Sequence, residues 1–233
     1  MLNYLRCTVV ALMLAPGAAQ AFGAGLEVAR AGDYAEALQK WRPLAKQGHA
    51  RVQYSLGVIY ERGRGVPQNH AEAVRWYRRA AEQGLDSAQY NLGVMYGQGK
   101  GVTQDYAESV RWYRLAAEQR IANANAQFNL GNMYNEGRGV PQDSAEAVRW
   151  YQLAAKQGHA SAQLNLGIMH GTGQGVPQDD ATAHMWFNLA AANGASNGAP
   201  ARDLAASRLT AAGIDEAQHR ARVCMESGYQ DCD

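Results

Sequence analysis

Residues 92–119 read LGVMYGQGKGVTQDYAESVRWYRLAAEQ, and recognisable copies of this stretch stand on both sides of it. The copies share a Leu-Gly pair, and successive pairs are 36, 38 and 36 residues apart, at Leu56-Gly57, Leu92-Gly93, Leu130-Gly131 and Leu166-Gly167. A tryptophan keeps the same phase, at Trp76, Trp112, Trp150 and Trp186. A period of this length is typical of two-helix units that bury their apolar faces only by stacking on neighbours. The sequence therefore predicts an all-α solenoid of helix pairs.

Each unit has a first helix, a glycine-rich link and a second helix. In the first helix, Leu92 lies four residues after Ala88 and four before Tyr96, which is helical spacing for one buried face. Glycine inside a helix costs about 1 kcal/mol relative to alanine, so the recurring glycine after this leucine predicts close approach of the second helix. The second helix carries an apolar stripe that also predicts a buried face, which in the first unit consists of Ala73, Trp76, Tyr77, Ala80 and Ala81.

The links and the starts of the second helices indicate turns and caps rather than chemistry. Paired glycines such as Gly99 and Gly101 favour the positive φ angles of a helix end and a turn. GxG recurs, but neither GxGxxG nor GxxxxGK[ST] occurs, so we do not interpret these links as phosphate-binding loops. An Asn or Asp followed three residues later by Glu, as in Asp105 and Glu108, is close to a capping box. Because these carboxylates recur in phase, we interpret them as structural caps and not as a catalytic pair.

Four full units are expected, at residues 49–84, 85–120, 121–158 and 159–194. The third is two residues longer at its start, which predicts either a bulged connection or an early start of its first helix. Residues 22–48 form the N-terminal cap, with helices expected at 26–30 and 33–47. Residues 195–233 form the C-terminal cap, with a loop at 195–200 and helices expected at 202–212 and 215–227.

The first 21 residues are typical of a secretory signal peptide. Arg6 precedes an apolar run over residues 7–15, Pro16-Gly17 interrupts it, and Ala19-Gln20-Ala21 offers a small-x-small site for cleavage after Ala21. The alternative is an uncleaved anchor, but nine apolar residues fall well short of the roughly 20 that a spanning helix needs. We therefore expect a periplasmic or secreted protein.

The net charge and the cysteine content limit the kinds of partner and of bound metal that we expect. Removal of the leader takes away Arg6 and no acid, which leaves 21 basic against 21 acidic residues, a net charge of zero. This balance argues against nucleic acid, whose binding depends on neutralising phosphates. Export also leaves Cys224 and Cys232, a pair that an oxidising compartment would join as a disulfide pinning the C-terminus. A zinc site is the weaker alternative because it needs four ligands and only His219 lies close in sequence.

The repeated pattern resembles the Sel1-like repeats, which are related to the tetratricopeptide repeats. It is carried by Ala88, Leu92-Gly93, Tyr96, Gly99, Gly101-Val102, Asp105, Trp112-Tyr113 and Ala116-Ala117, and four in-phase copies cover about residues 49–194. The resemblance implies a right-handed superhelix of antiparallel helix pairs that serves as an adaptor for protein complexes. It also implies an exported bacterial protein active in envelope signalling, secretion or assembly.

The resemblance raises an enzymatic alternative as well. A branch of the family, the Helicobacter cysteine-rich proteins, is linked to β-lactam binding or hydrolysis, so the alternative is a cell-wall hydrolase or a β-lactam-acting protein. That branch carries a cysteine pair in each repeat, and no repeat here has a cysteine. Neither Ser-x-x-Lys nor His-Glu-x-x-His occurs. We therefore expect no enzyme activity, no catalytic residues, no cofactor and no metal site.

By resemblance to tetratricopeptide arrays, a partner would bind on the concave face lined by the first helices. Positions on this face form a row of aromatics beside a row of amides, which fits an extended peptide because asparagine both donates and accepts hydrogen bonds. The predicted protein- or peptide-binding residues are Tyr54, Ser55, Val58, Tyr90, Asn91, Val94, Asn125, Phe128, Asn129, Asn132 and Asn165. The open alternative is that these aromatics pack between adjacent first helices and that the amides bond within the scaffold.

A second surface lies on the outside of the second helices. A basic ridge is expected there, which we interpret as solvated charge offset by Glu82 and Glu118; it consists of Arg75, Arg111 and Arg149 with Arg78 and Arg114. With such a ridge we expect any contact with a membrane surface to be indirect. We expect the protein to be a monomer.

Overall fold

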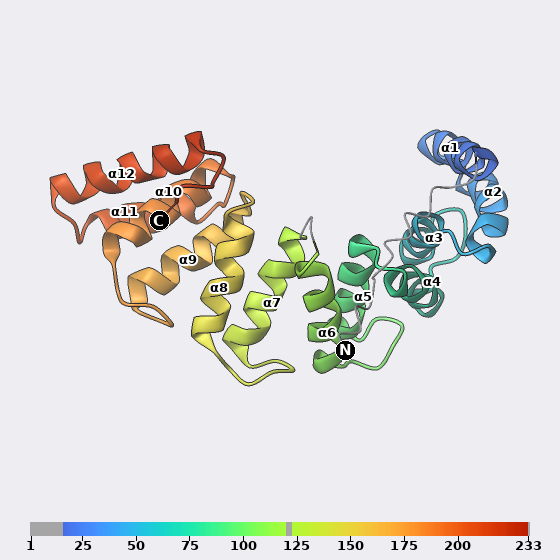
Figure 1. The fold of residues 1–233 in the computed structure, drawn as a ribbon, viewed down its shortest axis with the longest axis horizontal. Coiled ribbons are helices and arrows are strands. Elements are labelled where there is room, and N and C mark those ends of the chain that lie inside the picture. Colours follow the sequence, from blue (N-terminus) through green and yellow to red (C-terminus); the bar gives the residue numbers. More distant parts are fainter. Residues whose placement is uncertain (1–15, 120–122, 233) are drawn as a thin grey trace, which may run out of the picture. The chain divides into compact units, whose positions relative to one another are not determined.

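The computed structural model describes residues 16–119 and 123–232, and within them every regular element is an α-helix (Figure 1). This confirms the predicted all-α fold of repeated helix pairs. The chain divides into two compact units, Met1–Ala80 and Ala81–Asp233, and each is described here by itself.

The first unit holds α1 (Pro16–Arg30), α2 (Tyr34–Lys46), α3 (Ala50–Arg62) and most of α4 (His70–Glu82). The predicted helix at 26–30 is too short, because α1 starts at Pro16. Residues before Leu26 pack on α2: Phe22 lies 5.8 Å from the Trp41 ring, and the Trp41 indole N–H donates to the Phe22 carbonyl at 3.3 Å. The cleavage site expected after Ala21 falls within this helix, immediately before Phe22.

The second unit contains three helix pairs followed by two further helices (Figure 1). The pairs are α5 (Asp86–Gln98) with α6 (Tyr106–Ala117), α7 (Ala124–Glu136) with α8 (Ser144–Ala155), and α9 (Ala160–Thr172) with α10 (Asp180–Ala192). The last two helices, α11 (Gly198–Ala206) and α12 (Ala211–Glu226), pack on α10. Both begin earlier than predicted, because Pro200 fits the first turn of α11 and Thr210 caps α12.

Helix ends follow the predicted turn chemistry. The first helices of the four repeats end at glycines in the left-handed region, Gly63, Gly99, Gly137 and Gly173, with φ between 64° and 70°. The second helices start at side-chain caps: Asp105 and Asp143 accept the backbone N–H groups of Glu108 and Glu146 at 3.0 and 2.9 Å. Asn69 and Asp179 do the same for Glu72 and Thr182. The recurring acids are thus caps, as predicted.

The glycine after each repeated leucine makes room for an aromatic ring. A Cβ atom at Gly131 would lie 2.6 Å from the Tyr151 ring, and one at Gly167 would lie 2.4 Å from Phe187. The predicted close approach is therefore confirmed. Its cause is a ring from the second helix lying over the glycine, not contact between two backbones.

In the second unit, repeats stack through the second glycine of the link. Gly139 has φ of 73°, and a Cβ atom there would lie 2.4 Å from the Tyr106 carbonyl at the start of the preceding α6. Gly175 meets the start of α8 at Ser144 in the same way. One glycine thus ends the helix, and the other lets the link approach the neighbouring repeat.

A buried glutamine joins three helices at each of two repeat junctions. Gln127 in α7 is 3% exposed, donates to the Ala117 carbonyl at the end of α6 (3.3 Å) and accepts from Gln157 beyond α8 (2.7 Å). Gln163 in α9 likewise donates to the Ala155 carbonyl and accepts from Asn193. These bonds satisfy carbonyls that a helix end leaves without an intrahelical donor. The sequence pattern showed the glutamine but not this function.

The structure corrects one expectation for the first helices and decides between two alternatives for the third repeat. The repeated Tyr60, Tyr96 and Tyr134 are half-buried and not part of the fully buried face. The hydroxyl of Tyr134 accepts from Arg114 of the preceding repeat at 2.6 Å, which holds it at the seam between repeats. In the third repeat, α7 does not begin early: it has 13 residues, as do α5 and α9, so the two additional residues lie in the connection. Part of that connection, residues 120–122, is outside the described residues.

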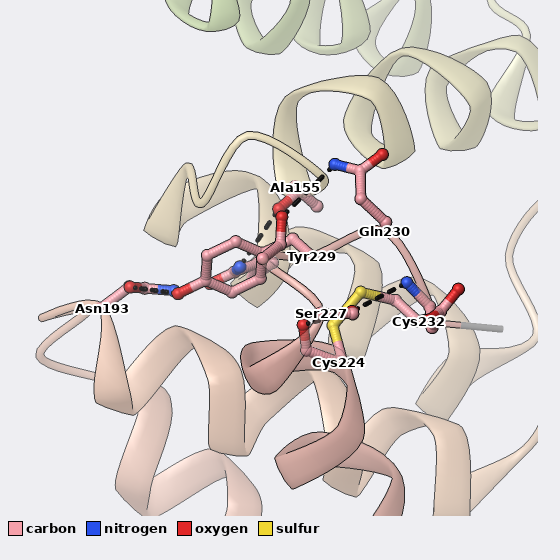
Figure 2. Close-up of a disulfide and its surroundings, with 10 residues drawn as sticks. Ala155, Asn193, Cys224, Ser227, Tyr229, Gln230 and Cys232 are labelled. Carbon is pink, nitrogen blue, oxygen red and sulfur yellow. Dashed lines mark hydrogen bonds between the residues drawn. A yellow bond between two sulfur atoms is a disulfide. The ribbon is translucent and has the colours of Figure 1, made fainter.

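The C-terminal tail folds back over the last repeats (Figure 2). Cys224 in α12 and Cys232 are joined as a disulfide that closes a loop with a sequence separation of 8. Tyr229 in this loop donates its hydroxyl to Asn193 at 2.8 Å, and its ring lies against Gly158 at the junction of α8 and α9. The disulfide therefore holds a side chain that contacts two repeats.

Reducing the disulfide is expected to lower the free energy of unfolding by about 2 kcal/mol, because the open tail regains conformational entropy and releases Tyr229. Thermal unfolding with and without dithiothreitol should show a drop of about 5 °C in the midpoint. The control is Tyr229→Phe, which removes one partly exposed hydrogen bond and is expected to cost less than about 1.5 kcal/mol. Equal midpoints in both redox states would contradict this role of the tail.

Candidate partner-binding face

The residues predicted for partner binding divide between the two units. In the first unit, Tyr54, Ser55 and Val58 of α3 line an open cleft of about 400 Å³, together with residues of α1 and α2. In the second unit, the predicted residues lie on α5, α7 and α9, where all are half-buried except the exposed Asn125. Their role in binding stays a prediction.

The aromatics of this face rest on the second helix of their own repeat. Tyr90 lies 5.9 Å from the Tyr113 ring, and Phe128 lies 5.9 Å from the Tyr151 ring. Tyr54 of the first unit stacks on Tyr77 in the same manner. Each ring thus pairs with the tyrosine of its own repeat, and Phe128 also stacks on His159 at the start of the next first helix, so for Phe128 the alternative of packing between adjacent first helices holds in part.

Amides of this face bond within the scaffold, as the open alternative predicted, and their partners include the tyrosines of the second helices. Tyr151 donates its hydroxyl to Asn132 Oδ1 at 2.7 Å, and Asn165 Nδ2 donates to the same oxygen at 3.4 Å. Asn129 lies within hydrogen-bonding reach of the Tyr113 and Tyr90 hydroxyls. The apolar stripe of the second helices predicted these tyrosines only as core residues; the recurring Trp-Tyr pair was the available signal that a hydroxyl accompanies the ring.

Burial fixes these tyrosines as hydrogen-bond donors. Desolvation raises the pKa of Tyr113 to about 12, against the lowering effect of its hydrogen bonds to Asn129 and Ser109. Desolvation likewise raises the pKa of Tyr151 to about 12. Tyrosine is already protonated at neutral pH, and the raised pKa extends this state to more alkaline pH, so the Tyr151 hydroxyl donates its hydrogen bond to Asn132 Oδ1 throughout the neutral range.

A histidine at the junction of α8 and α9 lies beside the aromatic residues of the predicted face. The His159 ring stacks on Phe128 at 4.7 Å, and its Nδ1 accepts the Ala162 backbone N–H at 3.2 Å. Desolvation lowers the pKa of His159, which favours the neutral ring. With Nδ1 accepting, the proton resides on Nε2, which donates to Asn125 Oδ1 at 3.2 Å. His159 thus orients the one fully exposed amide of the face.

The outer ridge is paired differently from the prediction. Arg75, Arg111 and Arg149 form i,i+3 ion pairs with Glu72, Glu108 and Glu146 at 3.2–3.3 Å, so Glu82 and Glu118 are not their partners. The capping glutamates therefore neutralise the ridge locally. Exposed pairs of this kind contribute little to stability.

The described residues contain neither a clustered set of metal-ligating side chains nor a helix suited to span a membrane. Within residues 16–119 and 123–232, no three His, Cys, Asp or Glu side chains come together in a way that could hold a metal ion. None of the helices in the same part of the chain combines the length and apolar character needed to cross a bilayer.

The helix pairs, the glycine-seated rings and the stacked links define a helical repeat protein of the tetratricopeptide-like class. The family model described as Sel1 repeat matches residues 50–85, 86–120, 124–159 and 160–194. The chain belongs to the Sel1 repeat family. Proteins of this family generally mediate protein–protein interactions, and their fold is generally a non-enzymatic scaffold.

Two solved structures show the likeness in detail. A Sel1 repeat protein from Oxalobacter formigenes is 34% identical, with a TM-score of 0.70 over 76% of this chain and 71% of that chain. The protein c5321, a protective antigen present in uropathogenic Escherichia coli strains, is 38% identical, with a TM-score of 0.68 over 76% of this chain. The match spans only 42% of c5321. No curated protein matches the chain.

Proposed function

We propose that this protein is an exported, non-enzymatic scaffold that binds a peptide or protein partner in the bacterial envelope through the first-helix face. The observation that carries the proposal is the amide row of α7 and α9. Asn132 and Asn165 are half-buried, are oriented by the Tyr151 hydroxyl, and keep hydrogen-bonding groups beyond those the scaffold uses. Side chains fixed before binding lose less entropy when a partner arrives.

The periplasmic or secreted location rests on the leader-like residues 1–21, and the cysteine pair is consistent with an oxidising compartment. It is tested by sequencing the N-terminus of the protein recovered from periplasm and medium. We expect the mature chain to start at Phe22. Recovery of the full-length chain from the cytoplasm alone would contradict export.

Partner binding is tested by affinity capture from envelope extracts, using the full mature chain as bait. The double variant Asn129→Ala, Asn165→Ala is expected to lose at least about tenfold of the captured partner, because the amides that pair with its backbone are gone. The matched control is Gln104→Ala, Gln142→Ala, which removes two exposed amides from the links instead. Equal capture by both variants would place the binding surface elsewhere.

The enzymatic alternative has no observation in its favour, and a direct assay decides it. The purified mature chain is incubated with a chromogenic β-lactam and, separately, with labelled peptidoglycan. We expect no turnover above that of heat-denatured protein. Turnover by the purified mature chain would replace the scaffold proposal with a catalytic one.

A further inference from the structure

The cleft of the first unit differs from the amide row in its chemistry. Its apolar part comes from three helices, with Leu26 from α1, Trp41 from α2 and Val58 from α3. Its charged part is Arg30 at the end of α1, Arg62 in the last turn of α3 and Arg64 just beyond it. No acidic residue is among the residues that line it. An apolar floor is thus edged by cations.

These arginines are exposed, and their charges are not neutralised locally. Within the described part of the chain, none of Arg30, Arg62 and Arg64 forms an ion pair, in contrast to Arg75 on α4. Arg64 instead bonds the Tyr34 hydroxyl at 3.1 Å and covers the Tyr34 ring at 5.2 Å. The cleft therefore keeps an unbalanced positive charge.

The charge of the surrounding chain has the same sign. Residues 16–80 contain ten basic and five acidic residues, a net charge of +5, whereas residues 81–233 contain 11 basic and 16 acidic residues, a net charge of −5. The near-zero total charge of the protein hides this asymmetry. An acidic partner would be attracted to the first unit at long range and selected by the cleft at contact.

We propose that this cleft receives an apolar side chain from a peptide segment that carries carboxylates on both sides of it. The proposal deepens the proposed function, on which it rests, by giving the partner a chemical class. A free anion would make no use of the apolar floor. A nucleobase would find only the half-buried Tyr54 ring to stack on, and that ring already packs on Tyr77; Trp41 is 3% exposed, and the Tyr34 ring is covered by Arg64.

The test uses the full mature chain and a labelled eight-residue peptide with Leu-Phe at its centre and two glutamates at each end. Fluorescence anisotropy should show saturable binding with a Kd on the order of 10–100 µM. Replacing the glutamates by lysines, or Leu-Phe by Ala-Ala, should weaken binding at least about tenfold, because the first change repels the arginines and the second leaves the floor uncovered. Equal binding of all three peptides would overturn the proposal.

Variants of the protein locate the site. Arg30→Glu and Arg62→Glu should each weaken peptide binding about tenfold, and Arg62→Gln should weaken it less, since it removes a charge without adding one. Lys46→Glu makes the same charge change at an exposed position outside the cleft and should have little effect. Circular dichroism melts show whether each variant is folded. If Lys46→Glu weakened peptide binding as much as the cleft variants do, the effect would come from the overall charge of the protein, and the cleft would not be the binding site.

The remaining outcomes identify other occupants and also overturn the proposal. They are displacement of the peptide by a single-stranded oligonucleotide, stronger binding to anionic phospholipid vesicles, or a concentration-dependent dimer in sedimentation that Arg62→Glu abolishes. Envelope capture separates this inference from the function on which it rests. If the peptide fails to bind while capture still depends on Asn129 and Asn165, the cleft proposal falls alone.

Discussion

Replacing Gln127 with leucine is expected to lower the free energy of unfolding by about 3 kcal/mol, although the side chain becomes more apolar. The substitution removes the bond to the Ala117 carbonyl and the bond from Gln157, in a place where Gln127 is 3% exposed. Each buried group left without a partner costs about 1–3 kcal/mol, and the burial gained by leucine offsets only part of this. Urea unfolding followed by circular dichroism measures the change.

The matched control for this prediction is Gln142→Ala. Gln142 also donates from its amide to a backbone carbonyl, that of Asn135, at 2.7 Å, but both groups are at the surface. Water replaces the lost bond there, so the expected cost is below about 1 kcal/mol. If Gln127→Leu cost no more than Gln142→Ala, the glutamine would not be joining the repeats.

Two glycines of the same helix are expected to respond in opposite directions to alanine. Gly167 lies under the Phe187 ring, where a Cβ atom would be 2.4 Å from the ring, so Gly167→Ala should destabilise the protein by about 2–3 kcal/mol despite the better helix propensity. Gly171, one turn later, has ordinary contact with Ala183 at 3.5 Å. Gly171→Ala should therefore stabilise the protein by about 0.5–1 kcal/mol.

These two variants separate the effect of side-chain packing from that of helix propensity, because both substitutions add one methyl group to α9. Urea unfolding of the two variants gives the signs directly. Gly167→Ala with wild-type stability would mean that the ring moves aside without cost. If Gly171→Ala were also destabilising, the helix would tolerate no methyl group at either position. The loss at Gly167 could then not be attributed to its close contact with the Phe187 ring.

The repeat period, the caps and the glycine-rich turns were predictable because each depends on residues near one another in sequence. Asp105 needs only the backbone N–H of Glu108, and Gly99 needs only its own φ angle. The ends of the chain were predicted less well. Phe22 and Gly25 belong to a helix because Trp41 packs against them, and that contact lies outside any local pattern.

The candidate site was predicted as a face but not as a network. Helical spacing places Asn129, Asn132 and Asn165 on the first helices, and it also places Tyr113 and Tyr151 on the second helices. Nothing in that spacing shows that a ring which fills the space over a glycine also reaches an amide with its hydroxyl. The arginines of the first-unit cleft were missed for two reasons. Arg30 and Arg62 hold no recurring position in the period, whereas Arg64 lies in the glycine-rich link, which was interpreted only as a turn although its middle residue is basic in three of the four repeats.

The sequence alone determined the helix pairs, their phase and the family, because a pattern repeated four times reports short-range requirements of backbone and turn that act within each copy. Only the tertiary structure decided how those copies are joined. The bond between Gln127 and Gln157, the ring over Gly167 and the contact between Tyr229 and Asn193 each depend on the distance between atoms about 20 to 36 residues apart in the chain. Such distances follow from packing, which no local pattern encodes.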